Sequence, residues 1–235
     1  MPVAQPARDL IGLGIYTVPE ASRLIHIPSQ RIRRWIRGYA YGPKDNRKTQ
    51  RPIWASQIAA LDGDQAVGFL DLMELRFVDA FTNLGLSHKT VRLAAAAAKE
   101  MFGVDHPFAT RSFRTDGKRV LAKIDRRGES PHLLDLGSGQ FTIYDVVVPT
   151  LFEGVDFDDC GAAKTWRPMK DKAPLVILDP LRSFGRPIID TCGIPTAVLA
   201  TAARVEGSVD EVAAQYEVDI ESVEQAVLFE MRQAA

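Results

Sequence analysis

Cysteine and histidine are scarce in this chain, and long apolar runs are absent. The two cysteines, Cys160 and Cys192, are isolated from each other and from any metal-binding spacing, so we expect both thiols to be reduced. No apolar run approaches the roughly 18 residues that a membrane span needs. The start, Met-Pro-Val-Ala-Gln-Pro, lacks the basic and apolar regions of a signal peptide. We therefore expect a cytoplasmic protein with no membrane partner.

Signatures of enzymes are missing too. The sequence contains no Gly-x-Ser-x-Gly motif, no P-loop and no His-Glu-x-x-His zinc motif. Its histidines are scattered: His26, His88, His106 and His132. Such positions, in a turn, at a helix start and in loops, serve caps and surfaces more often than catalysis. We expect no catalytic residue, no cofactor and no enzymatic activity. Turnover of RNA or a nucleotide by the purified protein would reverse this expectation.

Charge is present but unevenly distributed. With 235 residues, 46% apolar and 25% charged, the chain is long enough for two or three compact units. Residues 1–51 hold ten Lys or Arg against three acids, whereas residues 205–235 hold eight acids against one base. The net charge of the whole chain is only −1. Because the two signs are sorted to opposite ends, we expect each end to have its own partner.

Residues 16–37 have the pattern of two short helices joined by a tight turn. Residues 16–25 form the first pattern, His26-Ile27-Pro28 the turn, and residues 29–37 the second pattern. Gly38 follows, and glycine commonly ends a helix. This arrangement predicts a helix-turn-helix.

The second helix would have an apolar face and a basic face. At 3.6 residues per turn, the apolar face consists of Ile32, Trp35 and Ile36. The opposite face and its flanks consist of Gln30, Arg31, Arg33, Arg34 and Arg37. Arginine and glutamine in a major groove bond to base edges and phosphates, so the helix fits a DNA-recognition helix. The alternative is a solvated amphipathic helix whose arginines have no partner.

A hairpin is predicted directly after this helix. Residues 39–54 have strand-like aromatic ends around a turn rich in Gly, Pro, Asp and Asn. Its basic side chains are Lys44, Arg47, Lys48 and Arg51. A basic hairpin behind a recognition helix is typical of a wing, and it extends the predicted DNA-binding surface.

Two longer helices should follow the wing. Residues 71–84 show apolar side chains at helical spacing, namely Leu72, Leu75, Phe77, Val78 and Phe81. After Gly85, Ser87 can cap a second helix that runs to Phe102. This order resembles the DNA-binding domain of MerR-type winged-helix regulators over residues 14–103. The resemblance implies that Arg33 is a phosphate clamp. No long dimerising helix and no cysteine cluster follows, so metal or drug sensing is not implied.

The middle, residues 104–171, is less informative. Residues 112–124 alternate around Asp116-Gly117, which favours a hairpin. Residues 140–148 fit either a strand or the start of a helix. The acidic loop 153–160 could suggest a metal site, but it lacks the glycine and distal glutamate of a calcium loop. We expect no bound metal there.

The last segment predicts two short strands and three helices. The strands fall at residues 174–178 and 184–189. The first helix begins near Pro195 and ends at Glu206-Gly207, the second is capped by Ser208, and the third runs from Asp219 to about Arg232. The predicted helical core consists of Val212, Tyr216, Val218, Val223, Val227 and Leu228.

Residues 176–231 resemble a small bacterial antitoxin domain of homeodomain-like fold. The resemblance is carried by residues 185–190, Gly193-Ile-Pro195 and the pattern from Ser208 to Ala226. Where that family has Gly-Thr-Arg-Ile-Pro, this chain has no arginine. Together with the MerR-like part, the chain resembles a VapB-type antitoxin of a VapBC toxin–antitoxin operon. This implies a PIN-like ribonuclease toxin and operator DNA as partners, in a homodimer or a toxin–antitoxin hetero-oligomer.

The acidic end is poorly suited to DNA, because phosphate would repel it. We expect it to bind protein, with Glu217, Glu221 and Glu224 facing a basic groove of the toxin. Two alternatives stay open. The acids could merely solubilise amphipathic helices, or Arg182 or Arg186 could reach carboxylates of the toxin.

The sequence thus predicts a mainly α fold with small β elements (α+β). Its expected parts are a winged helix-turn-helix at 14–103, a connecting β-containing segment at 104–171, and a β-hairpin with three helices at 172–235. The function expected is that of an antitoxin that represses its own operon. The alternative is a MerR-like regulator whose C-terminal domain binds an effector or a protein.

Overall fold

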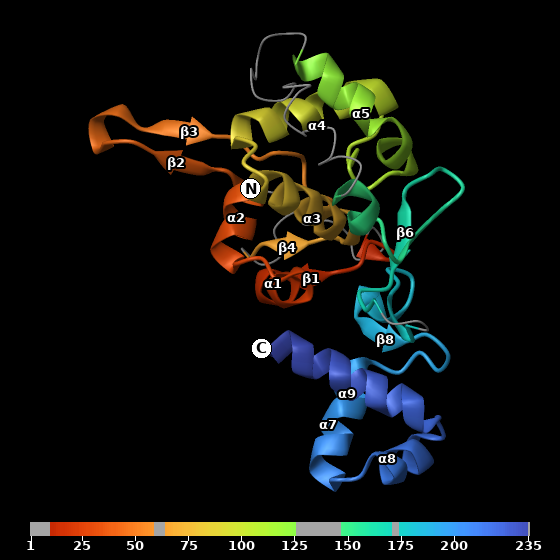
Figure 1. Cartoon of the computed structure of the whole chain (residues 1–235). Helices are drawn as coiled ribbons and strands as arrows, with labels where there is room; N and C mark the ends of the chain where they lie inside the picture. The colour runs from red at the N-terminus through yellow and green to blue at the C-terminus, as the bar shows by residue number, and fades with distance from the viewer. Residues whose placement is uncertain (1–9, 59–63, 126–146, 171–173, 235) are drawn as a thin grey trace. The chain divides into compact units, whose positions relative to one another are not determined.

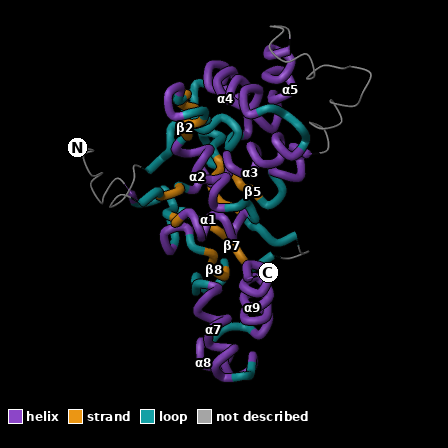
Figure 2. Tube along the Cα trace, turned by 90° about the vertical axis from the view of Figure 1, so that its left-hand side faces the viewer, coloured by secondary structure: helices purple, strands orange, loops and turns teal. Residues whose placement is uncertain are grey.

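The computed structural model describes residues 10–58, 64–125, 147–170 and 174–234 (Figure 1). These residues form two compact units. The N-terminal unit comprises the described residues of 17–152 and 157–163, and the C-terminal unit those of 1–16, 153–156 and 164–235. Helices predominate and the strands are short (Figure 2), which confirms the expected mainly α fold with small sheets.

The predicted helix-turn-helix is present. The short strand β1 (Tyr16–Thr17) leads into α1 (Val18–Ile25), and α2 (Ser29–Arg37) follows after the turn. Thr17 accepts a hydrogen bond from the Glu20 N–H, and the Glu20 carboxylate accepts one from the Thr17 N–H, so a capping box starts α1. His26 has a left-handed backbone with φ of 54°, which ends α1 and turns the chain toward α2.

The predicted wing is also present. Strand β2 (Tyr39–Tyr41) pairs antiparallel with β3 (Lys48–Gln50), with Ala40 opposite Thr49. The connection contains the 3-10 turn η2 (Lys44–Asn46), and Gly42 has φ of 97°. A Cβ on Gly42 would lie 2.8 Å from the Asn46 carbonyl oxygen, so only glycine fits this turn. The hairpin projects away from the helices of its unit (Figure 1).

Two longer helices support this motif. Strand β4 (Ala66–Val67), which pairs with β1, leads into α3 (Phe69–Asn83), and α4 (His88–Phe102) follows. All five apolar positions predicted for α3 are buried. Ser87 caps α4 by accepting a hydrogen bond from the Thr90 N–H, as predicted. A cluster of buried aromatic rings fills the core behind α3, consisting of Phe77, Phe81, Phe108, Phe113 and Phe152.

The hairpin predicted at residues 112–124 is wrong. This stretch lies within a single helix, α5 (Arg111–Asp125), which contacts α4. Thr110 starts the helix, because its hydroxyl accepts a hydrogen bond from the Phe113 N–H. Phe113, Gly117 and Val120 recur at helical spacing and are buried. The periodicity of 3.6 and the cap therefore outweigh the turn preference of Asp116-Gly117.

Only part of residues 140–148, for which strand and helix stayed open, can be compared with the structure. Residues 147–151 are helical, and residues 140–146 lie outside the described part of the chain.

A four-stranded sheet precedes the C-terminal helices, in the order β5-β6-β7-β8. Its strands are β5 (Val155–Phe157), β6 (Ala163–Trp166), β7 (Val176–Leu178) and β8 (Pro187–Ile189). The strand predicted at 174–178 is β7. The strand predicted at 184–189 begins only at Pro187, because residues Ser183–Gly185 form the 3-10 turn η3. In this turn Ser183 and Phe184 have φ of 47° and 55°, which no strand residue adopts.

Three helices complete the C-terminal unit: α7 (Thr196–Glu206), α8 (Val209–Tyr216) and α9 (Ile220–Ala234). Val212 and Val223 are fully buried, as predicted, together with Leu199, Ala226 and Phe229. Tyr216, Val218 and Val227 are half-buried. Leu228 does not belong to the core, since it is 41% exposed. It follows Val223 by five residues, which turns it about 140° away from that side chain on the helix.

Candidate nucleic-acid interface and acidic surface

The exposed face of α2 is basic. Ile32, Trp35 and Ile36 are buried, which anchors the helix on the rest of its unit. The predicted recognition residues are all at least partly exposed: Gln30, Arg31, Arg33, Arg34 and Arg37. The structure thus brings together on one helix the side chains that the spacing placed on one face.

These side chains are not equally free. Arg31 donates to Asp79 of α3, with Nη1 and Oδ1 2.6 Å apart, so it fastens α2 to α3. The guanidinium of Arg34 lies 4.7 Å from the ring centroid of Tyr39, where the wing begins. Among the described residues, no side-chain partner is found for Arg33 or Arg37. We therefore expect Arg33 and Arg37 to be the most available donors, and Arg31 to act mainly in positioning.

The wing adds more positive charge beside α2. Arg47, Lys48 and Arg51 are exposed, and Lys44 belongs to the turn η2 between the strands. The Arg51 carbonyl accepts a hydrogen bond from Arg92 of α4 at 2.9 Å, which ties the end of the wing to that helix. The helix face and the wing are therefore two parts of one basic surface.

The pKa of His88 is affected by the positive charge of this surface. Its ring centroid lies 6.2 Å from that of Trp35 of α2. Partial burial lowers the pKa of His88, and the positive charges of Arg92, Arg31 and Arg34 lower it further. Sequence reasoning took His88 for a cap or surface residue and did not consider Arg92. His88 and Arg92 are four residues apart on one face of α4, and this spacing was the sequence signal that they are neighbours.

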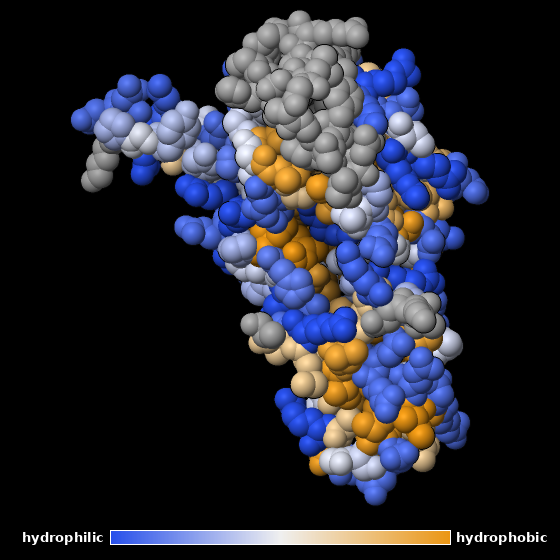
Figure 3. Space-filling model, in the orientation of Figure 1, coloured by the Kyte–Doolittle hydropathy of each residue, from blue (hydrophilic) through white to orange (hydrophobic). Residues whose placement is uncertain are grey.

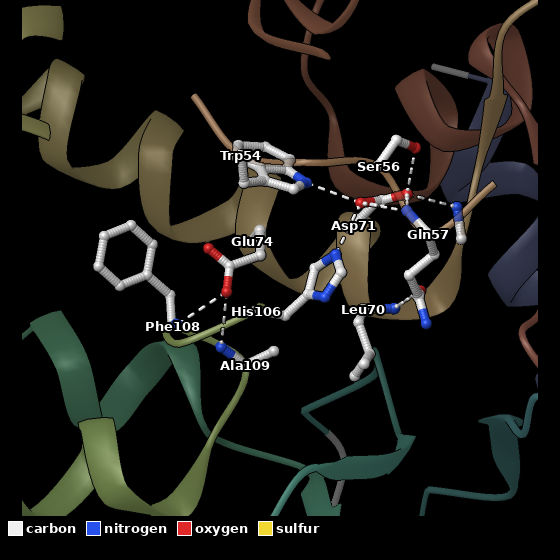
Figure 4. Close-up of polar contacts among 10 residues, drawn as sticks. Trp54, Ser56, Gln57, Leu70, Asp71, Glu74, His106, Phe108 and Ala109 are labelled. Carbon is white, nitrogen blue, oxygen red and sulfur yellow. Dashed lines mark hydrogen bonds and ion pairs between the residues drawn. The ribbon is translucent and has the colours of Figure 1, made fainter. Parts of the chain in front are cut away.

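A buried polar network holds the base of the wing (Figure 4). Asp71, at the start of α3, accepts hydrogen bonds from the Trp54 indole at 2.7 Å and from Ser56 at 2.7 Å. His106, in the segment after α4, lies 3.0 Å from Asp71 through its Nε2. Burial would raise the pKa of Asp71, but the hydrogen bond and charge of His106, with the other donors, hold it below its usual value. The network joins three segments that are distant in sequence.

Glu74, one turn further along α3, is also buried. Its Oε1 accepts from the backbone N–H groups of Phe108 and Ala109 at 2.7 and 3.1 Å. Its Oε2 is buried and has no hydrogen-bond partner among the residues that the structure describes. Burial raises the pKa of Glu74 well above its usual value, against the effect of the two N–H donors. With Asp71 fully buried and His106 nearly so, this group supports the fold and offers no access to a substrate.

The residues expected to contact a protein partner lie on the C-terminal unit. Glu217, Glu221 and Glu224 are at least partly exposed around the turn between α8 and α9. Arg182 is not free, because its guanidinium donates to the Asp190 carboxylate at 2.6 Å and to the Asp190 carbonyl at 2.8 Å. Arg186 is exposed.

The acidic loop at 153–160 gives no metal site in the described part of the chain. Asp156 pairs with Arg167 at 2.7 Å, and the Asp158 carboxylate accepts from the Ala162 N–H. No group of three His, Cys, Asp or Glu side chains able to hold a metal occurs among the described residues. Cys160 and Cys192 are free and exposed, and His132 lies outside the described residues.

Comparison with known proteins agrees with this geometry. Residues 14–95 match a family model described as "Putative DNA-binding HTH domain". The curated protein "Putative antitoxin VapB45" of Mycobacterium tuberculosis is 26% identical over 222 residues, which cover 91% of this chain and 92% of that protein. The chain is a homologue of VapB45. The helix-turn-helix match thus lies within a similarity to a putative antitoxin that extends over nearly the whole chain.

A solved structure shows the same fold. The crystal structure of Rv2018 from Mycobacterium tuberculosis superposes with a TM-score of 0.68 over 90% of this chain and 96% of the other, at 23% identity. No helix of the described residues is long and apolar enough to cross a membrane.

Proposed function

We propose that this protein is an antitoxin that binds and neutralises a PIN-like ribonuclease toxin and represses its own operon. The observation that carries the proposal is the exposed basic surface of α2 and the wing, in a chain whose last helices are acidic. The homology to VapB45 supports the antitoxin part. We further propose that residues 14–103 bind operator DNA and residues 172–235 bind the toxin, with 104–171 as the connection.

Operator binding would follow from the shape of the N-terminal unit. A major groove accepts an α-helix, and Gln30, Arg34 and Arg37 of α2 can then contact base edges. Arg33 would clamp a phosphate, as in the MerR-like domains that this part resembles. The wing, with Lys44, Arg47, Lys48 and Arg51, would follow the backbone of the neighbouring groove. A dimer would bind an inverted repeat whose half-sites are roughly 34 Å apart or a multiple of it.

Binding to DNA from upstream of the protein's own reading frame tests this proposal. In fluorescence anisotropy over a salt series, Arg34→Ala or Arg37→Ala should lose the preference for operator over unrelated DNA. Lys48→Ala is the matched control in the wing. It should weaken binding to all DNA alike and reduce the salt slope by about one unit. If Arg33→Ala/Arg34→Ala binds the operator like the wild type, α2 is not the recognition helix.

The toxin-binding part rests on electrostatics. A ribonuclease needs a basic groove for RNA, and the acidic helices α8 and α9 can occupy such a groove through complementary potential. Glu217, Glu221 and Glu224 are placed on the surface where they could do so. Arg182 is engaged by Asp190, so of the two arginines considered, only Arg186 remains suited to reach the toxin's carboxylates.

A further inference from the structure

A groove runs between α7 and α9 of the C-terminal unit. Its volume is about 570 Å³. Ala197, Ala200 and Thr201 of α7 form one wall, and Val227 and Met231 of α9 form the other. The α7 wall is therefore lined by small side chains.

The groove is largely apolar, although it opens to solvent. Met231, which lines it, is 66% exposed. Figure 3 shows patches of hydrophobic surface over α7 and α9. A partner that covers these exposed apolar side chains would gain hydrophobic free energy.

The charges around the groove indicate which kind of partner can bind in it. Residues 205–235 carry eight acids against one base, and Glu230 lines the groove itself, held by the Thr196 hydroxyl at 2.5 Å. Arg204 also lines it and balances Glu230, so the excess of acid comes from the rim. The rim consists of exposed carboxylates beside the lining residues, namely Glu206 next to Gly207, Asp210 next to Val209, and Glu224 one turn before Val227 on α9. A second copy of this chain would bring the same acidic helices together, and the like charges would repel. The complementary occupant is a basic one.

We propose that the groove binds a basic amphipathic helix of the partner protein. Apolar side chains at positions i, i+3 or i+4, and i+7 of that helix would contact Val227 and Met231, while flanking Lys or Arg would face the acidic rim. α7 has 11 residues and is about 16 Å long, which matches about three turns of the incoming helix. This inference rests on the proposed antitoxin function and names the surface and the chemistry of its partner.

The test uses the full-length chain and the protein encoded by the neighbouring reading frame. Met231→Asp places a charge in the groove, and Leu228→Asp places the same charge on the same helix outside it. We expect Met231→Asp to weaken binding by about thirtyfold, as loss of an interface hot spot does, and Leu228→Asp by less than about threefold. Titration calorimetry measures both affinities, and circular dichroism checks the fold of each variant.

A second variant covers the case in which Met231→Asp does not fold. Thr201→Arg fills the groove from the exposed face of α7 and should weaken binding to a similar extent. Hydrogen exchange on the complex should protect a Lys- or Arg-rich helix of the partner.

Three results would overturn the inference. If the wild-type chain does not bind the neighbouring protein, the antitoxin function fails together with it. If the wild type binds and both groove variants behave like Leu228→Asp, only the groove assignment fails. If Met231→Asp turns a dimer of this chain into a monomer without changing its affinity for the partner, a second copy occupies the groove.

Discussion

Two carboxyl groups one turn apart on α3 show how strongly the surroundings of a single residue set its chemistry. Asp71 is surrounded by donors and by His106, so its pKa is lowered and it stays ionised. Burial dominates at Glu74, which has two backbone donors on one oxygen and, within the described part of the chain, none on the other, so its pKa is raised. A charge on Glu74 is therefore costly, while the charge on Asp71 is compensated.

Glu74→Gln should change the pH dependence of stability. The pKa of Glu74 is higher in the folded than in the unfolded protein. Its contribution to the free energy of unfolding is therefore fully present at pH values below the pKa in the unfolded protein, and it is lost as the pH rises through the pKa in the folded protein. Glutamine keeps the carbonyl oxygen that accepts from Phe108 and Ala109 and does not ionise. We expect the variant to match the wild type within about 1 kcal/mol at pH 5 and to be more stable at pH 9.

Chemical denaturation at the two pH values measures this difference. Glu224→Gln, which removes a carboxyl group on the surface, is the control and should show no comparable gain between pH 5 and pH 9. An equal stability difference for Glu74→Gln at both pH values would mean that Glu74 is not the titrating group.

At the scale of elements, local signals predicted most boundaries. Ser87 and Ser208 cap α4 and α8 as expected, and apolar spacing placed α3 and α9. The helix α5 was missed because Asp116-Gly117 is a strong turn signal in isolation, whereas the Thr110 cap and the burial of one helical face, with the contact to α4, outweigh it. Tertiary packing can override a turn preference, and a single sequence does not display packing.

Ser208→Ala tests one such local signal. The Ser208 hydroxyl accepts the hydrogen bond of the Glu211 N–H at 3.2 Å, at the start of α8. Its loss should cost about 1 kcal/mol of unfolding free energy. Ser208→Asp, which keeps an acceptor at the same position, should retain most of the stability. Urea denaturation of the wild type and the two variants measures these differences in stability. Similar midpoints for Ser208→Ala and Ser208→Asp would show that the cap does not contribute.

The candidate site was only partly predictable for a related reason. The basic face of α2 follows from periodicity within nine residues, so the sequence displays it directly. The contacts that hold it and the wing in place are long-range: Arg31 bonds to Asp79, 48 residues away, and in the buried network below the wing His106 bonds to Asp71, 35 residues away. Pattern analysis finds which side chains share a face, whereas the partner that engages each side chain emerges only from the fold.

At the scale of the whole molecule, two pairs of helices joined by a tight turn, α1–α2 and α8–α9, carry opposite charge. The turns are built alike, since His26 and Glu217 both have φ of 54° at the end of the first helix. The surfaces differ, with arginines on α2 and glutamates around α8 and α9. The same local geometry can therefore present either sign, and charge rather than shape separates the proposed partners.

Reversing the acidic surface tests this separation. In the full-length chain, Glu217→Lys, Glu221→Lys and Glu224→Lys together should slow association with the neighbouring protein at least about tenfold at low salt. The effect should shrink at high salt, because screening removes long-range attraction. Operator affinity of the same variant should not fall. Stopped-flow measurements at two salt concentrations check the rates, and a salt-independent change would contradict electrostatic steering.

The three tryptophans allow the two parts of the chain to be followed separately by fluorescence. Trp35 lies under the basic face of α2 beside His88, Trp54 donates to Asp71 at the base of the wing, and Trp166 is buried in β6 of the C-terminal sheet. Indole emission responds to nearby charge and polarity. Variants that keep one tryptophan each would consequently follow DNA on one unit and protein on the other by their own fluorescence, without an attached dye.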